Sequence, residues 1–228
     1  NKNGIRTEIF TSEDRELIAK ELVDSKIDII ELGCMAESTE SKTRFAIYQN
    51  IEELSASIPT KRNRKQMYVG LYIGPDTELD KIPKHSDELC DGVRVILRYS
   101  ELEKSLKYCA SLAEKGYKVF VQPMLTMRYT DDELKRLIYE SNRMEAFAVY
   151  FVDSYGYMNE YDINRIYELY DKYLDPKIHI GFHAHNNLDM AFSNARHFMG
   201  MLKERNLIVD SCATGMGQGA GNLQTELI

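Results

Sequence analysis

The chain has 228 residues, 43% of them hydrophobic, which is enough to bury one sizeable core and too few to favour two ordinary domains. We therefore treat residues 1–228 as a single domain. The 29 Lys and Arg are scattered among 36 Asp and Glu, for a net charge of -7, which excludes the basic surface typical of nucleic-acid-binding proteins. The sequence contains neither an apolar run long enough to span a membrane nor an apolar secretory signal, so we expect a cytoplasmic protein without a membrane partner.

Short apolar runs rich in β-branched residues recur along the chain and are typical of buried strands. The segments between them show the period of amphipathic helices. This alternation predicts βα units and a parallel sheet. The seven predicted strands are Ile27–Leu32, Met67–Ile73, Val93–Leu97, Tyr117–Gln122, Phe147–Asp153, Ile178–Ala184 and Leu207–Ser211.

Several helix boundaries are marked by their residues. Ser100 and Glu103, and likewise Thr130 and Glu133, have the spacing of a capping box, in which a hydroxyl and a carboxylate satisfy free N–H groups at a helix start. Gly116 supplies a permissive helix end. We expect both capping boxes to begin helices.

A further helix is expected between Asn159 and Asp175. Its apolar residues fall on one stripe, which we predict to pack on the sheet: Ile163, Ile166, Tyr167 and Tyr170. The basic run from Lys61 to Lys65 lies between a helix and a strand, and we interpret it as a solvated turn.

The most informative segment is the predicted strand that ends at Phe182-His183-Ala184-His185. Because side chains alternate along a strand, His183 and His185 face the same way, with Cα atoms about 6 to 7 Å apart, whereas Phe182 and Ala184 face the helices. A lone histidine there is usually a polar residue in a wet crevice. Two in register at the end of a parallel strand predict a shared divalent metal ion, although the histidines alone do not select which one.

A glycine-rich segment follows the last predicted strand. Gly215, Gly217 and Ala220 satisfy the dinucleotide-binding spacing, but that motif needs an acidic residue about 20 positions further on, and the chain ends at Ile228. We therefore predict no nucleotide cofactor. The glycines instead allow the backbone to approach a ligand closely, and Asn222 offers an amide oxygen as a neutral metal ligand.

Polar residues also close two other predicted strands. Glu31 and Gly33 share one face at the end of the first, and Asp153 and Ser154 close the fifth. Singly, such residues are more often turn or supporting residues. Seven βα units fit either an open doubly wound sheet or a barrel that lacks one strand. Polar groups at the mouths of four strands favour the barrel, because barrel sites are built from several strand ends.

These motifs resemble those of the pyruvate-handling, metal-dependent aldolases and lyases, a family that includes 4-hydroxy-2-oxovalerate aldolase, HMG-CoA lyase and isopropylmalate synthase. The His-x-His-Asn and glycine motifs are specific in combination, and the other two are weak. The resemblance extends from about Ile27 to the C-terminus. The matching segments, in the family's order, are Ile30-Glu31-Leu32-Gly33, Asp153-Ser154-x-Gly156, Gly181–Leu188 and Gly215–Asn222.

The resemblance implies an α/β fold of the TIM (β/α)8 barrel type, with His183 and His185 as metal ligands. Asn222 matches a further ligand used in the lyase branch. Ser154 matches a position that touches the substrate carboxylate in the aldolases, and Glu31 is the second candidate for substrate binding. HMG-CoA lyase itself is disfavoured, because its reactive cysteine has no counterpart in the glycine motif.

The chain departs from the family at its start. Family members open with a strand that ends in Asp-x-Thr-Leu-Arg-Asp-Gly, which supplies an aspartate ligand and a catalytic arginine, and residues 1–10 contain no match. We therefore expect the predicted strands to be the second to the eighth, with the first strand missing from the chain. The catalytic base and the arginine are expected in that missing segment.

The resulting hypothesis is an enzyme that cleaves or forms a carbon–carbon bond in a 4-hydroxy-2-oxo acid, giving pyruvate and an aldehyde. A divalent metal, Mn or Mg by preference and Zn or Co as alternatives, would act as a Lewis acid. Two alternatives stay open: a Claisen-type acyltransferase resembling isopropylmalate or homocitrate synthase, and a non-catalytic barrel that serves as a binding module. The oligomeric state is also open, and a homo-oligomer is compatible with the sequence.

Overall fold

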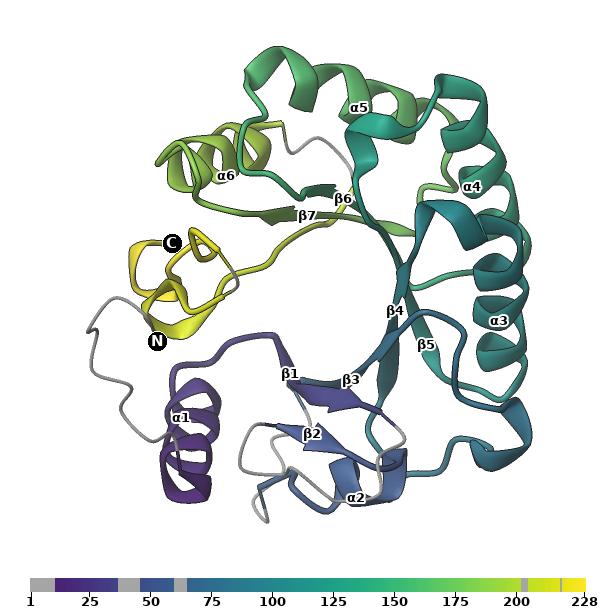
Figure 1. Cartoon of the computed structure of the whole chain (residues 1–228), viewed down its shortest axis with the longest axis vertical. Coiled ribbons are helices and arrows are strands. Elements are labelled where there is room, and N and C mark those ends of the chain that lie inside the picture. Colours follow the sequence, from purple (N-terminus) through teal and green to yellow (C-terminus); the bar gives the residue numbers. More distant parts are fainter. Residues whose placement is uncertain (1–10, 37–45, 60–64, 202–204, 218) are drawn as a thin grey trace.

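The computed structural model describes residues 11–36, 46–59, 65–201, 205–217 and 219–228. Eight strands form one sheet in the order β2-β1-β3-β4-β5-β6-β7-β8, and every pair is parallel. The sheet curves around a common interior and helices line its outside (Figure 1). The predicted fold class, the wall of a parallel α/β barrel, is therefore confirmed.

The strands are β1 (Ile29–Met35), β2 (Ile47–Tyr48), β3 (Met67–Ile73), β4 (Gly92–Leu97), β5 (Lys118–Pro123), β6 (Ala148–Asp153), β7 (His179–Ala184) and β8 (Leu207–Val209). The α-helices are α1 (Ser12–Asp24), α2 (Ile51–Ser55), α3 (Leu102–Glu114), α4 (Asp131–Arg143), α5 (Glu160–Tyr173) and α6 (Ala191–Gly200). None of the described helices is long and apolar enough to cross a membrane.

The wall has an open side. Among the described residues, β8 pairs only with β7 and β2 only with β1, so the two ends of the sheet do not meet. Figure 1 shows α1 and the segment after β8 on this open side, across the molecule from α3 and α4. The strands from β3 to β7, with α3 to α5 outside them, make up the closed wall.

The core has two layers that follow from strand alternation. Most buried apolar residues lie between the sheet and the helices. A smaller cluster fills the interior of the barrel and consists of Val69, Phe120, Ala148 and Tyr150. Arg94 on β4 is in register with Phe120 on β5, so this buried cation belongs to the inner layer.

Several local predictions are confirmed. Thr130 caps α4: its Oγ1 accepts from the Glu133 N–H at 3.3 Å, and the Glu133 carboxylate accepts from the Thr130 N–H at 2.8 Å. Gly116 follows the end of α3 with a φ of 96°. The predicted stripe on α5 is fully buried: Ile163, Ile166, Tyr167 and Tyr170.

The predicted capping box at Ser100 is wrong. A short 3-10 helix, Tyr99–Glu101, precedes α3, and the residue that caps α3 is Glu101, without a side-chain cap. Arg98 pairs with Glu101 at 2.8 Å and holds this turn in place. The α-helix therefore begins only at Leu102.

Two further differences concern the first strands. Gly33 does not share a face with Glu31, because a bulge at Leu32 puts Glu31 opposite Val69 and Gly33 opposite Gly70, and consecutive residues of β3 point to opposite faces. The sequence also gave no sign of β2, which has only 2 residues. Residues 1–10, where the family's first motif was sought, and most of the basic run at 61–65 lie outside the described residues.

Candidate functional site

The two histidines of the sequence motif lie side by side at the carboxyl end of β7. The ring centroids of His183 and His185 are 5.2 Å apart, and the rings are inclined at 72°. The preceding residue, Phe182, points outward and packs against Phe198 of α6, with ring centroids 5.6 Å apart. The predicted alternation is confirmed, and both imidazoles are directed away from the helices.

A carboxylate from the neighbouring strand end holds one of these rings. Nδ1 of His183 is 2.9 Å from Oδ2 of Asp210, the residue after β8. Arg94 contacts both carboxylate oxygens of Asp210, through Nη2 to Oδ1 at 3.1 Å and through Nη1 to Oδ2. Burial by itself would raise the pKa of Asp210, but the Arg94 guanidinium and the hydrogen bond with His183 hold that pKa well below its ordinary value.

The contact with Asp210 indicates which ring nitrogen of His183 carries the hydrogen. A carboxylate in a fork-like pair with a guanidinium can only accept hydrogen bonds, so Nδ1 of His183 is the donor. In the neutral imidazole, Nε2 then carries the lone pair and is free to bind a cation. Burial lowers the pKa of His185, and the neighbouring His183 lowers it further, which favours the neutral imidazole that ligates metals.

The glycine segment brings Asn222 to the same place. The Asn186 N–H donates to the Gly221 carbonyl at 3.0 Å, and His185 and Asn222 face each other as a bridge pair. Nδ2 of Asn222 donates to the Met216 carbonyl at 3.0 Å. Its Oδ1 is buried and has no hydrogen-bond partner among the described residues. An acceptor in this state is costly unless a ligand satisfies it.

Glycine is required where the loop wraps around this amide. A Cβ at position 217 would come within 2.6 Å of the Asn222 amide nitrogen. Gly215 and Gly221 have φ values of 70° and 85°, which residues with a side chain rarely adopt. The glycines therefore serve to close the loop on Asn222. The close approach of this backbone to a ligand stays a prediction.

The donors offered to a metal ion are two imidazoles and one amide oxygen. Among the described residues, no group of three His, Cys, Asp or Glu side chains is arranged to hold a metal ion. Asp210 does not add to the set, because Arg94 and His183 already engage it. Two imidazole nitrogens and one amide oxygen suit a divalent first-row transition metal such as Mn²⁺. Mg²⁺ prefers oxygen ligands and would need further oxygen donors from water or substrate.

Of the two predicted substrate-binding residues, only Glu31 faces the interior. A cavity of about 890 Å³ runs through the open side, and its lining includes Glu31, Arg94, His183, Asp210 and Asn222. The Glu31 carboxylate forms an ion pair with Nε of Arg94 at 2.7 Å, and 33% of the Glu31 side chain remains exposed.

Ser154 lies beyond the end of β6 and does not line this cavity. Its Oγ accepts a hydrogen bond from the Leu125 N–H at 2.9 Å, where Leu125 has a φ of 56°. The preceding Asp153 is buried and accepts from the Tyr157 and Met158 N–H groups at 3.0 Å each, which fixes the loop that carries Ser154.

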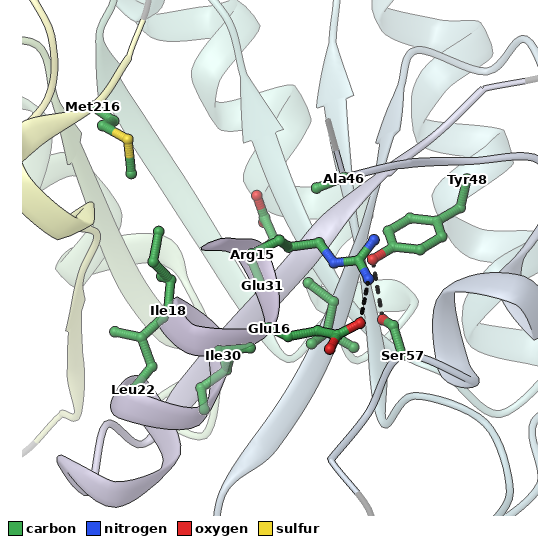
Figure 2. A pocket seen from close by; sticks show the side chains of 12 residues that line it. Arg15, Glu16, Ile18, Leu22, Ile30, Glu31, Ala46, Tyr48, Ser57 and Met216 are labelled. Carbon is green, nitrogen blue, oxygen red and sulfur yellow. Dashed lines mark hydrogen bonds and ion pairs between the residues drawn. The ribbon is translucent and has the colours of Figure 1, made fainter. Parts of the chain in front are cut away.

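A second cavity lies between α1 and the ends of β1 and β2. Its volume is about 470 Å³, and Glu31 and Met216 line both cavities. Figure 2 shows Ile18, Leu22 and Ile30 on its apolar side and Tyr48 on the other, with the Tyr48 hydroxyl donating to Ser57 at 3.1 Å. The cavity lined by His183 and Asn222 thus adjoins a more apolar cavity on the open side.

Arg94 and Asp210 are the site residues that the sequence reasoning missed. Arg94 interrupts the apolar run Val93–Leu97, and it is only 5% exposed. A buried cation needs an anionic partner, so an arginine within an apolar strand could have indicated a buried ion pair at this place. Its partners are far away in sequence, and the sequence does not identify them.

The family model described as HMGL-like matches residues 3–228. Curated relatives named 4-hydroxy-2-oxovalerate aldolase are 27% identical over 226 residues in Geobacillus genomosp. 3 and 28% identical over 222 residues in Carboxydothermus hydrogenoformans. Each alignment covers 96% of this chain and 64% of the relative. The relative from Burkholderia pseudomallei is 29% identical over 215 residues, covering 90% of this chain and 58% of the relative. The chain thus spans about three-fifths of the length of these relatives.

Solved structures share the fold at lower identity. Hydroxymethylglutaryl-CoA lyase from Pseudomonas aeruginosa superposes with a TM-score of 0.71 and 16% identity, over 97% of this chain and 78% of that one. The carboxyl transferase domain of Rhizobium etli pyruvate carboxylase, solved with pyruvate, gives a TM-score of 0.68 and 13% identity, over 95% of this chain and 38% of that one. At these identities the likeness concerns the fold alone.

Proposed function

The chain belongs to the HMGL-like family, and on that basis we propose that it is a divalent-metal-dependent aldolase or lyase. Its substrate is a 4-hydroxy-2-oxo acid, which it cleaves to pyruvate and an aldehyde or forms from them. The observation that carries the proposal is the placement of two neighbouring imidazoles near Asn222, whose buried amide oxygen has no hydrogen-bond partner among the described residues. The names of the curated relatives support the aldolase reaction over the other activities of the family.

In this proposal His183, His185 and Asn222 hold a divalent ion, with Mn²⁺ or Mg²⁺ preferred and Zn²⁺ or Co²⁺ as alternatives. When bound, the ion supplies a Lewis acid for the reaction of the 2-oxo acid. The site lies where parallel strands end, the place at which barrel enzymes bind their substrates. The cavity beside His183 is large enough for a small oxo-acid.

The chain's own residues have separate tasks. Ser154 is the proposed contact for the substrate carboxylate. Its Oγ accepts from the Leu125 N–H, outside the lining of the cavity beside His183, so this contact requires a substrate that extends beyond the cavity. Glu31 presents its exposed carboxylate edge to the cavity and is the proposed second substrate contact. A general base must also accept the hydroxyl proton during cleavage, and we assign no residue to this step.

The test is release of pyruvate from a series of 4-hydroxy-2-oxo acids that differ in the aldehyde portion, with Mn²⁺ or Mg²⁺ present. We expect His183→Ala and His185→Ala each to lower kcat/KM by at least about a hundredfold, because each removes a metal ligand. His197→Ala is the matched control, since His197 lies on α6 and contacts Asn164 at 2.8 Å. Its activity should stay unchanged.

Two results would contradict the proposal. Pyruvate release from none of the compounds by metal-loaded protein would exclude the aldolase reaction. Thiol release from acetyl-CoA in the presence of a 2-oxo acid would instead assign the chain to the Claisen-type acyltransferases.

A further inference from the structure

Arg94 crosses the interior of the barrel and contacts residues near both ends of the sheet, on β1 and just after β8. Its Nε pairs with Glu31 on β1 at 2.7 Å, and its Nη atoms contact both oxygens of Asp210 beyond β8. In the sheet, β4 is separated from β8 by three other strands, so this contact spans the barrel rather than a strand pair. One side chain of the closed wall therefore links β1 to the segment that follows β8.

The guanidinium itself is held in a fixed place. Its Cζ lies 4.5 Å from the ring centroid of Tyr150 on β6, and Gln122 on β5 accepts a hydrogen bond from Nη1. Tyr150 packs directly against Gly181 of β7, where a Cβ would come within 2.4 Å of the ring. Arg94 is thus seated on the same layer of the barrel that supports the strand of the histidines.

Arg94 is connected to His183 through the carboxylate of Asp210. The carboxylate oxygen that contacts Nη1 of Arg94, Oδ2, is also the one 2.9 Å from Nδ1 of His183. Asp210 follows a strand of only 3 residues that pairs, among the described residues, on one side alone. Tyr150 also interacts with this carboxylate, whereas the guanidinium contacts both of its oxygens and thereby fixes its orientation toward the imidazole.

We propose that Arg94 is a positioning residue for the metal centre. By clamping Asp210 it sets the ring orientation of His183 and keeps the proton on Nδ1, so that Nε2 faces the ion, and by pairing with Glu31 it fixes β1 against the same centre. This inference rests on the proposed function insofar as His183 is a metal ligand. A planar, two-pronged cation is needed because it must contact two carboxylates at once, which an ammonium group does poorly.

The experiment compares Mn²⁺ affinity, by titration calorimetry, in the wild-type protein, Arg94→Lys and Asp210→Asn. Arg94→Lys keeps the positive charge beside Glu31 and Asp210, which limits the loss of stability. Loss of a residue that orients a metal-bound histidine typically weakens affinity by about 10-fold to 100-fold, and we expect both variants to fall in this range. Arg98→Lys is the matched control, because Arg98 makes its ion pairs with Asp76 and Glu101 at the surface.

A second readout does not depend on metal. Nitrogen-15 NMR of the imidazoles in metal-free protein, with His183 assigned by its loss in His183→Gln, reports which nitrogen carries the proton. We expect the Nδ1–H form in the wild type and in Arg98→Lys. In Arg94→Lys and Asp210→Asn we expect a mixture of the two tautomers.

The outcomes separate this inference from the proposed function. Wild-type protein that binds no Mn²⁺ would contradict the proposed function, whereas the tautomer of His183 would still show whether Arg94 positions this ring. Wild-type binding of Mn²⁺ with equal affinity in Arg94→Lys, or an unchanged His183 tautomer in that variant, would overturn the positioning role.

Discussion

β6 and β8 lie on either side of β7 and differ in length, burial and number of paired neighbours. All 6 residues of β6 are buried, and the strand pairs with β5 and β7. The 3 residues of β8 are all half-buried, and among the described residues the strand pairs with β7 alone. The candidate metal centre is built at the boundary between these two regions.

The comparison explains how the site divides its tasks. The closed wall supplies the imidazoles of His183 and His185 on a strand that is fixed from both sides. The segment after β8 supplies Asp210 and Asn222, which orient one imidazole and add an amide oxygen. Arg94 joins the two regions, so the less constrained part of the site is held from the more constrained part.

The largest expected effect tests whether stability resides in the closed wall. Phe182 is fully buried, and its ring stacks on Phe151 with centroids 4.8 Å apart. Phe182→Ala should lower the free energy of unfolding by about 3 to 5 kcal/mol, because it leaves a cavity in a packed core. Urea unfolding followed by circular dichroism measures this loss, since the chain has 0 Trp for fluorescence.

Leu22→Ala on the open side is the variant to compare with Phe182→Ala on the closed wall. Leu22 is half-buried and already borders the cavity beneath α1 (Figure 2). Because little packing is lost there, we expect a cost of about 1 kcal/mol or less. Similar losses in the two variants would show that the open side contributes as much stability as the closed wall.

The second expected effect is that a bound metal ion stabilises the open side more than the closed wall. An ion bound by His183, His185 and Asn222 would connect β7 to the segment after β8. At a Mn²⁺ concentration a hundredfold above Kd, the free energy of unfolding should rise by about 2.7 kcal/mol. Hydrogen exchange should then slow most in residues 207–217, because these open most easily without the ion.

His183→Gln provides the control for this measurement. It should show neither the stabilisation nor the added protection, and a chelator should reverse both in the wild-type protein. Equal stabilisation of wild-type protein and His183→Gln would place Mn²⁺ binding somewhere other than this site.

What the sequence could predict depends on neighbours along the chain rather than on the boundary between the two regions, because β1, β8 and the strands of the closed wall were all predicted. Runs of β-branched residues predicted each strand of the closed wall, because buried parallel strands are apolar on both faces. Strand alternation was also sufficient to place His183 beside His185. Both features depend on neighbours in the sequence and are therefore visible in it.

The missed features depend on contacts between distant residues. The pairing of Arg94 with Asp210 joins residues 116 positions apart, and no local pattern identifies such partners. The bulge at Leu32 follows from how β1 aligns with β3, and it removed Gly33 from the predicted face. Local patterns therefore predicted the proposed ligands, whereas the groups that contact and orient them could be identified only from the fold.

The smallest expected effect compares two helix caps. Thr130 begins α4 on the closed wall, and Thr11 begins α1 on the open side, and both form complete capping boxes. Thr130→Ala should lower the free energy of unfolding by about 1 kcal/mol, the usual cost of losing such a cap. Thr11→Ala should cost less in global stability, because no described residue of α1 is fully buried and the helix can fray without unfolding the sheet. Its effect should appear as faster hydrogen exchange within α1, whereas Thr130→Ser, which keeps the hydroxyl, should resemble the wild type. Equal global losses from the two alanine variants would mean that α1 unfolds together with the closed wall, and the two regions would then form one cooperative unit.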